Sequence, residues 1–267
     1  MAQKKVVLIT GASSGIGLMT AEFLAQNGFK VYGMAINDFY STTFTYIKGD
    51  VTKEESIKEV LKEIWQKEKR LDAVINNAGF GISGAVEHTL DSSVFNIFNV
   101  NVLGLMKVCK NAIPYLRDNG EGKIINIGSV ASDLPIAFQS YYSATKASVK
   151  SFSLALREEV KPFDIKVTCV MPGDAKTGFT ANRKKNLVET DVNYGLRIKN
   201  SVARMEKDEE NGMDPICISK TILKVLNSKN PKPIKVVGFK YKVFCVLNKI
   251  LPQRLVSFIL GKMYGCN

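Results

Sequence analysis

A tyrosine and a lysine four residues apart are the first side chains whose types and spacing could do chemistry. Tyr142 and Lys146 stand in the stretch Tyr-Ser-Ala-Thr-Lys, and residues four apart lie on one face of a helix. An ammonium beside a phenol stabilises the phenolate and lowers the phenol's pKa from about 10. The pair therefore predicts a general acid/base that works near neutral pH. Tyr141 is no match, because its partner four residues on is the uncharged Thr145. A packed aromatic ring beside a solvated lysine has the same spacing and is the alternative.

A glycine-rich turn near the N-terminus could bind a ligand that carries phosphates. It reads Thr-Gly-Ala-Ser-Ser-Gly-Ile-Gly over residues 10–17 and follows the apolar run Val6–Ile9. Glycines permit a tight turn and a close approach of backbone to a phosphate pair, and a following helix offers free N–H groups and its dipole. The pattern predicts a dinucleotide-binding turn, with a ligand-free glycine turn as the alternative. The expected cofactor contacts in it are Gly11, Ser13, Ser14, Gly15, Ile16 and Gly17.

Six motifs in one order resemble the short-chain dehydrogenase/reductase family over residues 5 to about 177. They are Thr-Gly-x-x-x-Gly-x-Gly at residues 10–17, Asn76-Asn77-Ala78-Gly79, Asn101, Ser129, Tyr142-x-x-x-Lys146 and Pro172-Gly173. The resemblance implies a Rossmann fold with an extra strand, a nicotinamide cofactor, and a homodimer or homotetramer.

The resemblance also implies a role for each matched residue. Ser129 would hydrogen-bond the substrate carbonyl or hydroxyl, Lys146 would also hold the nicotinamide ribose, and Asn101 would hold a water in the proton relay. The remaining cofactor contacts would be Asp50 and Val51 at the adenine, Asn77 and Gly79 at the adenine ribose, and Thr177 at the nicotinamide carboxamide. A satisfied helix kink for Asn101 and a loop hydroxyl for Thr177 are the alternatives.

The end of the second strand bears on the choice between NAD and NADP. NAD-specific relatives carry an acidic residue there, bonded to the ribose 2′-hydroxyl. This chain has Ala35 followed by Ile36, and the arginine that NADP-specific members often have at the Ile36 position is missing too. Without a carboxylate nothing repels a 2′-phosphate, and Ser13, Ser14 and Asn37 could donate hydrogen bonds to it. The sequence therefore predicts NADP(H) in preference to NAD(H), with Ile36 beside the ribose.

The elements that must position these residues alternate along the chain. Apolar, β-branched runs predict strands at Val6–Ile9, Lys30–Ala35, Phe44–Ile47, Ala73–Ile75, Lys123–Ile127, Ile165–Val170 and Ile234–Val237. Helices are predicted at Met19–Gln26, Ser56–Lys67, Val94–Leu116, Tyr141–Val160 and Ile216–Leu226. This order predicts an α/β protein, a three-layer Rossmann fold with a central parallel sheet and helices on both faces, in a single domain over residues 1–267. Only about eight residues separate Ala35 from Phe44, so no ordinary helix fits there.

Composition narrows the class of protein. Five cysteines are scattered without the spacing of a metal or redox site, which favours reduced thiols and a cytoplasmic location. His88 is the single histidine, so no cluster of histidine ligands can form and no metal is expected. The chain carries a net charge of +12 but no nucleic-acid recognition motif, so no nucleic-acid partner is expected.

The C-terminal third carries the charge imbalance. Residues 215–267 hold ten of the 37 basic residues and none of the 25 acidic ones. Residues 178–214 are polar without a clear period and predict a substrate lid, and residues 239–267 form a basic, apolar C-terminal extension with helical character interrupted at Pro252. The extension could line an apolar pocket with its lysines near an anionic substrate end, rest on an anionic membrane, or pack as a terminal helix with a solvated basic face.

The sequence predicts an NAD(P)-dependent oxidoreductase that interconverts a secondary alcohol and a ketone. The Pro231–Gly238 and Leu251–Leu255 stretches resemble members that act on hydroxysteroids, retinoids and acyl-dihydroxyacetone phosphates, so a bulky apolar substrate such as a hydroxysteroid or bile acid is expected. A reductase of a lipid or acyl ketone and a catalytically inactive nucleotide-binding regulator are the alternatives. The complete set of Ser129, Tyr142 and Lys146 argues against the inactive regulator.

Overall fold

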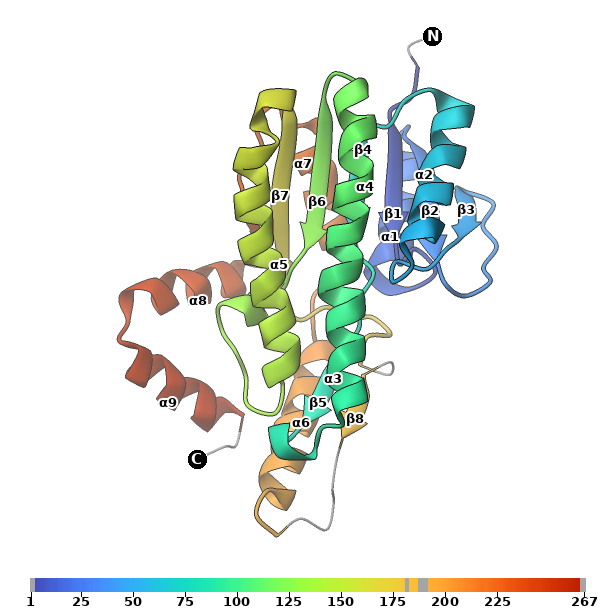
Figure 1. Cartoon of the computed structure of the whole chain (residues 1–267). Helices are drawn as coiled ribbons and strands as arrows, with labels where there is room; N and C mark the ends of the chain where they lie inside the picture. The colour runs from blue at the N-terminus through green and yellow to red at the C-terminus, as the bar shows by residue number, and fades with distance from the viewer. Residues whose placement is uncertain (1–2, 181–182, 187–191, 265–267) are drawn as a thin grey trace.

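A sheet of seven parallel strands forms the centre of the protein in a computed structural model, which describes residues 3–180, 183–186 and 192–264 (Figure 1). The strands lie in the order β3-β2-β1-β4-β6-β7-β9. They are β1 (Val6–Thr10), β2 (Lys30–Ala35), β3 (Thr45–Lys48), β4 (Ala73–Asn76), β6 (Gly122–Ile127), β7 (Ile165–Pro172) and β9 (Ile234–Val237). The predicted three-layer fold is confirmed, and so is the helix-free crossover between β2 and β3.

Helices cover both faces of the sheet. One face packs against α1 (Gly15–Gln26) and α7 (Ile216–Asn227), and the other against α2 (Glu54–Glu68), α4 (Leu105–Asp118) and α5 (Ser140–Glu159). The side chains of β1 illustrate the reason. Val6 and Leu8 belong to the hydrophobic core on the α2–α5 face of the sheet, and Val7 and Ile9 belong to the core on the α1–α7 face. Successive side chains of a strand point to opposite faces, so an uninterrupted apolar run needs cover on both.

One long helix runs through the middle of the α2–α5 layer. α3 (Asp91–Phe98) continues through a π-helical turn, Asn99–Gly104, into α4. The whole stretch from Asp91 to Asp118 is long and apolar enough to cross a membrane by length and composition alone. In the fold its apolar face belongs to the core, where Val108 and Leu116 are fully buried. The same composition is therefore explained by packing between the sheet and α2 and α5.

Two features inside and beside the polar stretch were not predicted. α6 (Gly195–Glu210) is a regular helix, and β5 (Ile82–Gly84) pairs with β8 (Lys184–Asn186) in a separate two-stranded sheet. α6 buries positions on one face, but two of its five buried residues are Ser201 and Glu209, which hide the apolar period from a sequence scan. The predicted lid, residues 178–214, includes some positions outside the described residues and stays a prediction.

The C-terminal extension folds as a helical hairpin, α8 (Phe239–Ile250) and α9 (Gln253–Met263). The break falls at Leu251–Pro252, as the proline predicted. Figure 1 shows the hairpin standing out from the body of the molecule beside α5. Its inner side packs through Cys245 and Val256 against Leu134.

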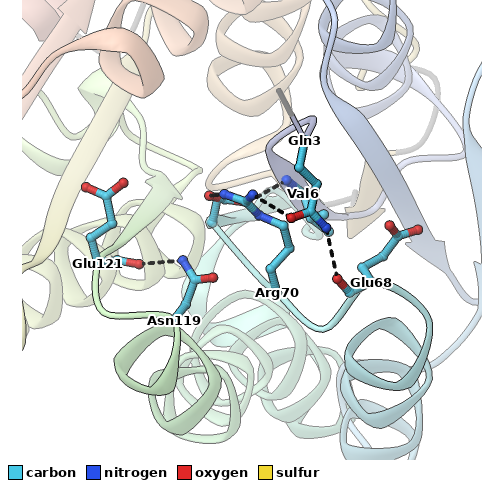
Figure 2. A network of polar contacts seen from close by, with 7 residues as sticks. Gln3, Val6, Glu68, Arg70, Asn119 and Glu121 are labelled. Carbon is cyan, nitrogen blue, oxygen red and sulfur yellow. Dashed lines mark hydrogen bonds and ion pairs between the residues drawn. The ribbon is translucent and has the colours of Figure 1, made fainter. Parts of the chain in front are cut away.

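A polar cluster ties the strands together at their amino-terminal edge (Figure 2). The Val6 N–H donates to Asp72 Oδ2 at 2.7 Å, and the Arg70 guanidinium donates to both Asp72 oxygens. Gln3 links the same arginine to the backbone of Glu68. Two hydrogen bonds from one guanidinium fix the orientation of the Asp72 carboxylate. Because Asp72 also accepts from Val6, it holds the start of β1 beside β4, at the edge opposite the carboxyl ends of the strands.

Candidate active site

The carboxyl ends of the strands open on one cavity of about 720 Å³. Clefts at this edge are where open parallel sheets bind ligands. Fourteen predicted site residues line it: Gly11, Ser13, Ser14, Gly15, Ile16, Ile36, Asp50, Val51, Asn77, Gly79, Ser129, Tyr142, Lys146 and Thr177. Gly17 and Asn101 do not line it, and neither does Asn37, which was expected to donate to a 2′-phosphate.

Tyr142 and Ser129 both line the cavity and lie within hydrogen-bond reach of each other. Tyr142 comes from the first turn of α5 and Ser129 from the loop after β6. Burial raises the pKa of Tyr142 to about 12, and a hydrogen bond from Ser129 works in the opposite direction. The Phe179 ring lies 5.6 Å from the Tyr142 ring, centre to centre. The phenol is therefore protonated at neutral pH and placed to donate a proton.

Lys146 lies one helical turn along α5 from Tyr142. Its ammonium is 5.7 Å from the centre of the Tyr142 ring and donates to the Ile127 carbonyl at 2.9 Å. Burial lowers the pKa of Lys146 to about 8. The expected lowering of the Tyr142 pKa does not hold in the protein alone, because burial outweighs the favourable influences on that phenol.

The glycine turn has the shape that a pyrophosphate needs. Gly11 and Gly15 have φ of 66° and 54°, which side chains resist. A Cβ on Gly17 would lie 2.1 Å from the Gly11 carbonyl oxygen, so Gly17 permits the close turn without itself reaching the cavity. Ser14 precedes α1 without a capping side-chain bond, which leaves the first N–H groups of the helix free for an anion. These residues fit a dinucleotide.

The adenine end of the cavity is built around Asp50. Its Oδ1 accepts from the Thr52 N–H at 2.8 Å and the Thr52 hydroxyl at 2.7 Å. Within the described residues Oδ2 has no hydrogen bond, so one oxygen is open to a ligand's amino group. Ile36, 60 % exposed, covers the neighbouring wall. The Tyr46 hydroxyl donates to the Ala35 carbonyl at 2.8 Å and holds the start of the short β2–β3 loop.

Asn101 stands behind the cavity wall. Its side-chain oxygen accepts from the Phe80 N–H at 3.0 Å, and its amide donates to the Phe80 carbonyl at 2.9 Å and to Thr145 at 3.3 Å. It therefore fixes the loop after β4 against the turn of α5 that carries Tyr142. This fits the alternative of a satisfied kink in the π-helical turn, while a water-holding role stays a prediction. Thr177 does line the cavity and accepts from the Phe179 N–H at 3.2 Å.

The C-terminal extension lines the outer part of the cavity, which was one of the roles expected for it, although the sequence identified none of the individual residues there. The walls of this outer part come from the stretch after β7 and from the hairpin, and include Asp174, Phe179, Lys240, Tyr241, Phe244, Leu247, Ile259, Met263 and Tyr264. The helical spacing of Tyr241, Phe244 and Asn248 was the available signal, since these positions share the inner face of α8. The hydroxyl of Tyr241 donates to Asp174 Oδ2 at 2.5 Å and ties α8 to the sheet.

The model of the short chain dehydrogenase family matches residues 5–188. The chain belongs to that family. It is therefore an oxidoreductase with a nicotinamide cofactor, and the resemblance noted in the sequence is confirmed. It is 37 % identical over 266 residues to a 3-ketodihydrosphingosine reductase of Bacteroides thetaiotaomicron, covering 98 % of this chain and 99 % of the relative.

Other matches agree on the family and the fold. An estradiol 17-beta-dehydrogenase 2 of Mus musculus is 27 % identical over 97 % of this chain and 74 % of its own length. A short-chain dehydrogenase from Streptomyces avermitilis has a similar structure, with a TM-score of 0.81, 28 % identity and 94 % of each chain covered.

Proposed function

We propose that this enzyme interconverts a ketone and a secondary alcohol on a long-chain or bulky lipid, with Tyr142 as the acid/base. One observation carries the proposal: the cavity that holds Tyr142 and Ser129 continues between α8 and α9 along apolar side chains. The hairpin's inner side, with Phe244, Leu260 and Met263, offers an apolar chain a dry wall. A small polar substrate would leave that wall unused.

The residues of the chain divide the chemical work between them. When bound, the nicotinamide supplies a hydride to the carbonyl carbon or takes one from the alcohol carbon. In reduction, Ser129 and Tyr142 hydrogen-bond the carbonyl oxygen, and Tyr142 gives it a proton. The raised pKa of Tyr142 keeps that proton available at neutral pH. Lys146, beside the phenol, stabilises the phenolate that remains and holds the ribose. Oxidation reverses these steps.

The preferred substrate class is a keto lipid, with a hydroxysteroid as the second candidate. The relative named for 3-ketodihydrosphingosine matches this chain nearly end to end, whereas the one named for estradiol is less identical and longer. The substrates in both names are largely apolar and could pack against the apolar wall of the cavity. NADP(H) is the proposed cofactor, because Ala35 and Ile36 offer no carboxylate to the adenine ribose.

The direct test is turnover of purified enzyme with NADPH or NADH on 3-ketodihydrosphingosine, estrone, a keto bile acid and a short aliphatic ketone. We expect activity on the long-chain ketone, faster with NADPH, and little on the short ketone. Turnover restricted to short, polar ketones would overturn the proposal. A homodimer or homotetramer and a cytoplasmic location stay predictions.

We further propose that the hairpin rests on an anionic membrane surface, from which a lipid can enter. The outer face of α8 carries a stripe of exposed apolar residues, Phe239, Val243, Val246 and Ile250, with Lys240, Lys242 and Lys249 beside it. Phe239 is 83 % exposed and Ile250 72 %. Apolar residues flanked by lysines suit the headgroup boundary. A second copy is a poorer occupant, because it would face these lysines with its own, in a stretch without acidic residues.

Vesicle sedimentation tests this proposal. The protein should bind vesicles of phosphatidylcholine with phosphatidylglycerol, and less to phosphatidylcholine alone or in high salt. Replacing Phe239 and Ile250 by serine should reduce binding about tenfold or more, whereas Leu196→Ser, also exposed at 78 % but on α6, should not. Equal binding by both variants, or a concentration-dependent dimer lost only in the hairpin variant, would overturn it.

A further inference from the structure

A half-buried carboxylate lies in the outer part of the cavity. Asp174 directly follows Pro172-Gly173 and lines the cavity. Its Oδ2 accepts from the Tyr241 hydroxyl. Within the part of the chain that the structure describes, Oδ1 has no hydrogen bond and no ion pair includes Asp174. Burial raises the pKa of this carboxyl group, which reports the cost of its charge in the cavity wall.

The backbone holds Asp174 in a fixed place. The Met213 N–H donates to the Asp174 carbonyl at 2.9 Å. Gly212 lies so close that a Cβ on it would be 2.7 Å from the same carbonyl group. The connection between α6 and α7 therefore clamps the backbone while Tyr241 of α8 orients the side chain. A carboxylate held from two sides is suited to fixed recognition rather than to loose solvation.

The charge of Asp174 reaches the reacting centre. Asp174 and Glu209 are both near enough that their charges raise the pKa of Tyr142. Glu209 is already compensated, because Arg183 forms a buried ion pair with it and the Thr180 hydroxyl donates to it at 2.5 Å. The charges of Lys240 and Arg183 lower the pKa of Asp174, but burial outweighs them, and neither residue forms an ion pair with it among the described residues. A cation bound at Asp174 would lie close to the carbonyl group that Tyr142 protonates.

We propose that Asp174 binds a protonated amine that the substrate carries next to its carbonyl group. The inference rests on the proposed function and narrows its substrate to a long-chain amino ketone. The ammonium donates to Oδ1 while Tyr241 keeps Oδ2, and the alkyl chain runs along the inner side of the hairpin. A sphingoid 3-ketone has its amine on the carbon next to the carbonyl, whereas a substrate with an anionic group at this end would be repelled.

The test compares two ketones that differ only in the amine: 3-ketodihydrosphingosine and 1-hydroxyoctadecan-3-one. The wild-type enzyme should prefer the amino ketone in kcat/KM by about tenfold or more. Asp174→Asn keeps an oxygen for Tyr241 but loses the charge. It should lower kcat/KM on the amino ketone about 10- to 100-fold, the worth of a charge-assisted hydrogen bond, and leave the amine-free ketone within about threefold.

Two variants separate the charge from the tie to α8. Tyr241→Phe removes the hydrogen bond but keeps the carboxylate, so the preference for the amine should survive. Asp118→Asn, an exposed aspartate at the end of α4, should match the wild type on both ketones. Equal losses on both ketones in Asp174→Asn would reduce Asp174 to a support for α8 and overturn the inference. Equal wild-type turnover of both ketones would overturn the inference but leave the proposed function intact. Turnover of neither ketone would overturn both the inference and the proposed function.

Discussion

Replacing Lys146 by methionine is expected to stabilise the protein at neutral pH while it removes most of the activity. Lys146 is 7 % exposed, and burial lowers its pKa from 10.5 to about 8. That difference corresponds to about 3 kcal/mol against the folded state below pH 8, where both states carry the proton. Methionine has a similar length without the charge. It forfeits the bond to the Ile127 carbonyl, which costs about 1 kcal/mol, so a net gain of about 2 kcal/mol remains.

The sign of this effect depends on pH in a definite way. Below pH 8 the lysine is protonated in both states, and the wild type carries the full cost of the buried charge. Between pH 8 and 10.5 the unfolded chain binds a proton that the folded protein does not, so wild-type stability rises with pH relative to the variant. Above 10.5 both states are neutral at this position. The advantage of Lys146→Met should therefore be full below pH 8 and be lost as pH rises toward 10.5.

Urea unfolding at pH 6.5, 7.5, 9 and 10.5 measures the difference. A gain of about 2 kcal/mol also corresponds to a Tm increase of roughly 4 to 8 °C for a domain of this size. Lys62→Met, on the exposed side of α2, serves as the matched control and should show no such pH trend. The reasoning is refuted if Lys146→Met is less stable than the wild type at pH 7, or if its gain is the same at pH 6.5 and 10.5.

Substitutions at Tyr142, Ile36 and Gly17 probe the proton and cofactor sites, with Tyr141→Phe as the control for Tyr142. Tyr142→Phe should lower kcat by roughly 10² to 10⁴ with cofactor binding, measured by fluorescence quenching, unchanged; a larger loss in Tyr141→Phe would contradict the choice of tyrosine. Ile36→Asp should move the NAD/NADP ratio of kcat/KM at least tenfold toward NAD and Ile36→Arg the other way; an unmoved ratio would place the β2–β3 loop away from the ribose. Gly17→Ala, whose Cβ would meet the Gly11 carbonyl at 2.1 Å, should weaken cofactor binding tenfold or more and lower Tm, and wild-type binding would contradict the glycine's role.

The sheet was predictable because its inner strands, such as β1 and β7, are apolar runs that must be buried on both faces. The elements that were missed or misplaced are those whose pattern of apolar residues is short, or is interrupted by glycine or buried polar residues. α1 begins at Gly15 rather than at Met19, since glycines of the nucleotide turn form its first turn despite their poor helix propensity. β5 and β8 have three residues each, too few for a period to be recognised. In α6, buried polar residues took apolar positions.

The catalytic end of the site was predictable for a different reason from the substrate end. Tyr142 and Lys146 share one helix, so their spacing already encodes their geometry. Asp174 and Tyr241 are separated by 67 residues, and each looks ordinary in its own surroundings. Only the packing of α8 beside the end of β7 brings them together. The pKa of Tyr142 is raised rather than lowered because the side chain is buried, and residue spacing does not reveal burial.

The structure connects the Asp174 carboxylate to the apolar α8–α9 hairpin, two features that lie far apart in the sequence. Asp174 offers one oxygen to the cavity and the other to Tyr241, so a single carboxylate touches both the space for the polar end of a substrate and the hairpin that lines the space for its apolar end. A cation at Oδ1 would favour the ionised carboxylate, which accepts the Tyr241 hydrogen bond more strongly than the protonated acid does. Binding of the amine should therefore tighten α8 against the sheet, and closing of the apolar wall should favour the amine in return, because coupling between two sites is reciprocal. Hydrogen exchange of the α8 amides, slower with the amino ketone than with its amine-free analogue, would measure that coupling, and equal rates would show that the carboxylate acts on its two partners independently.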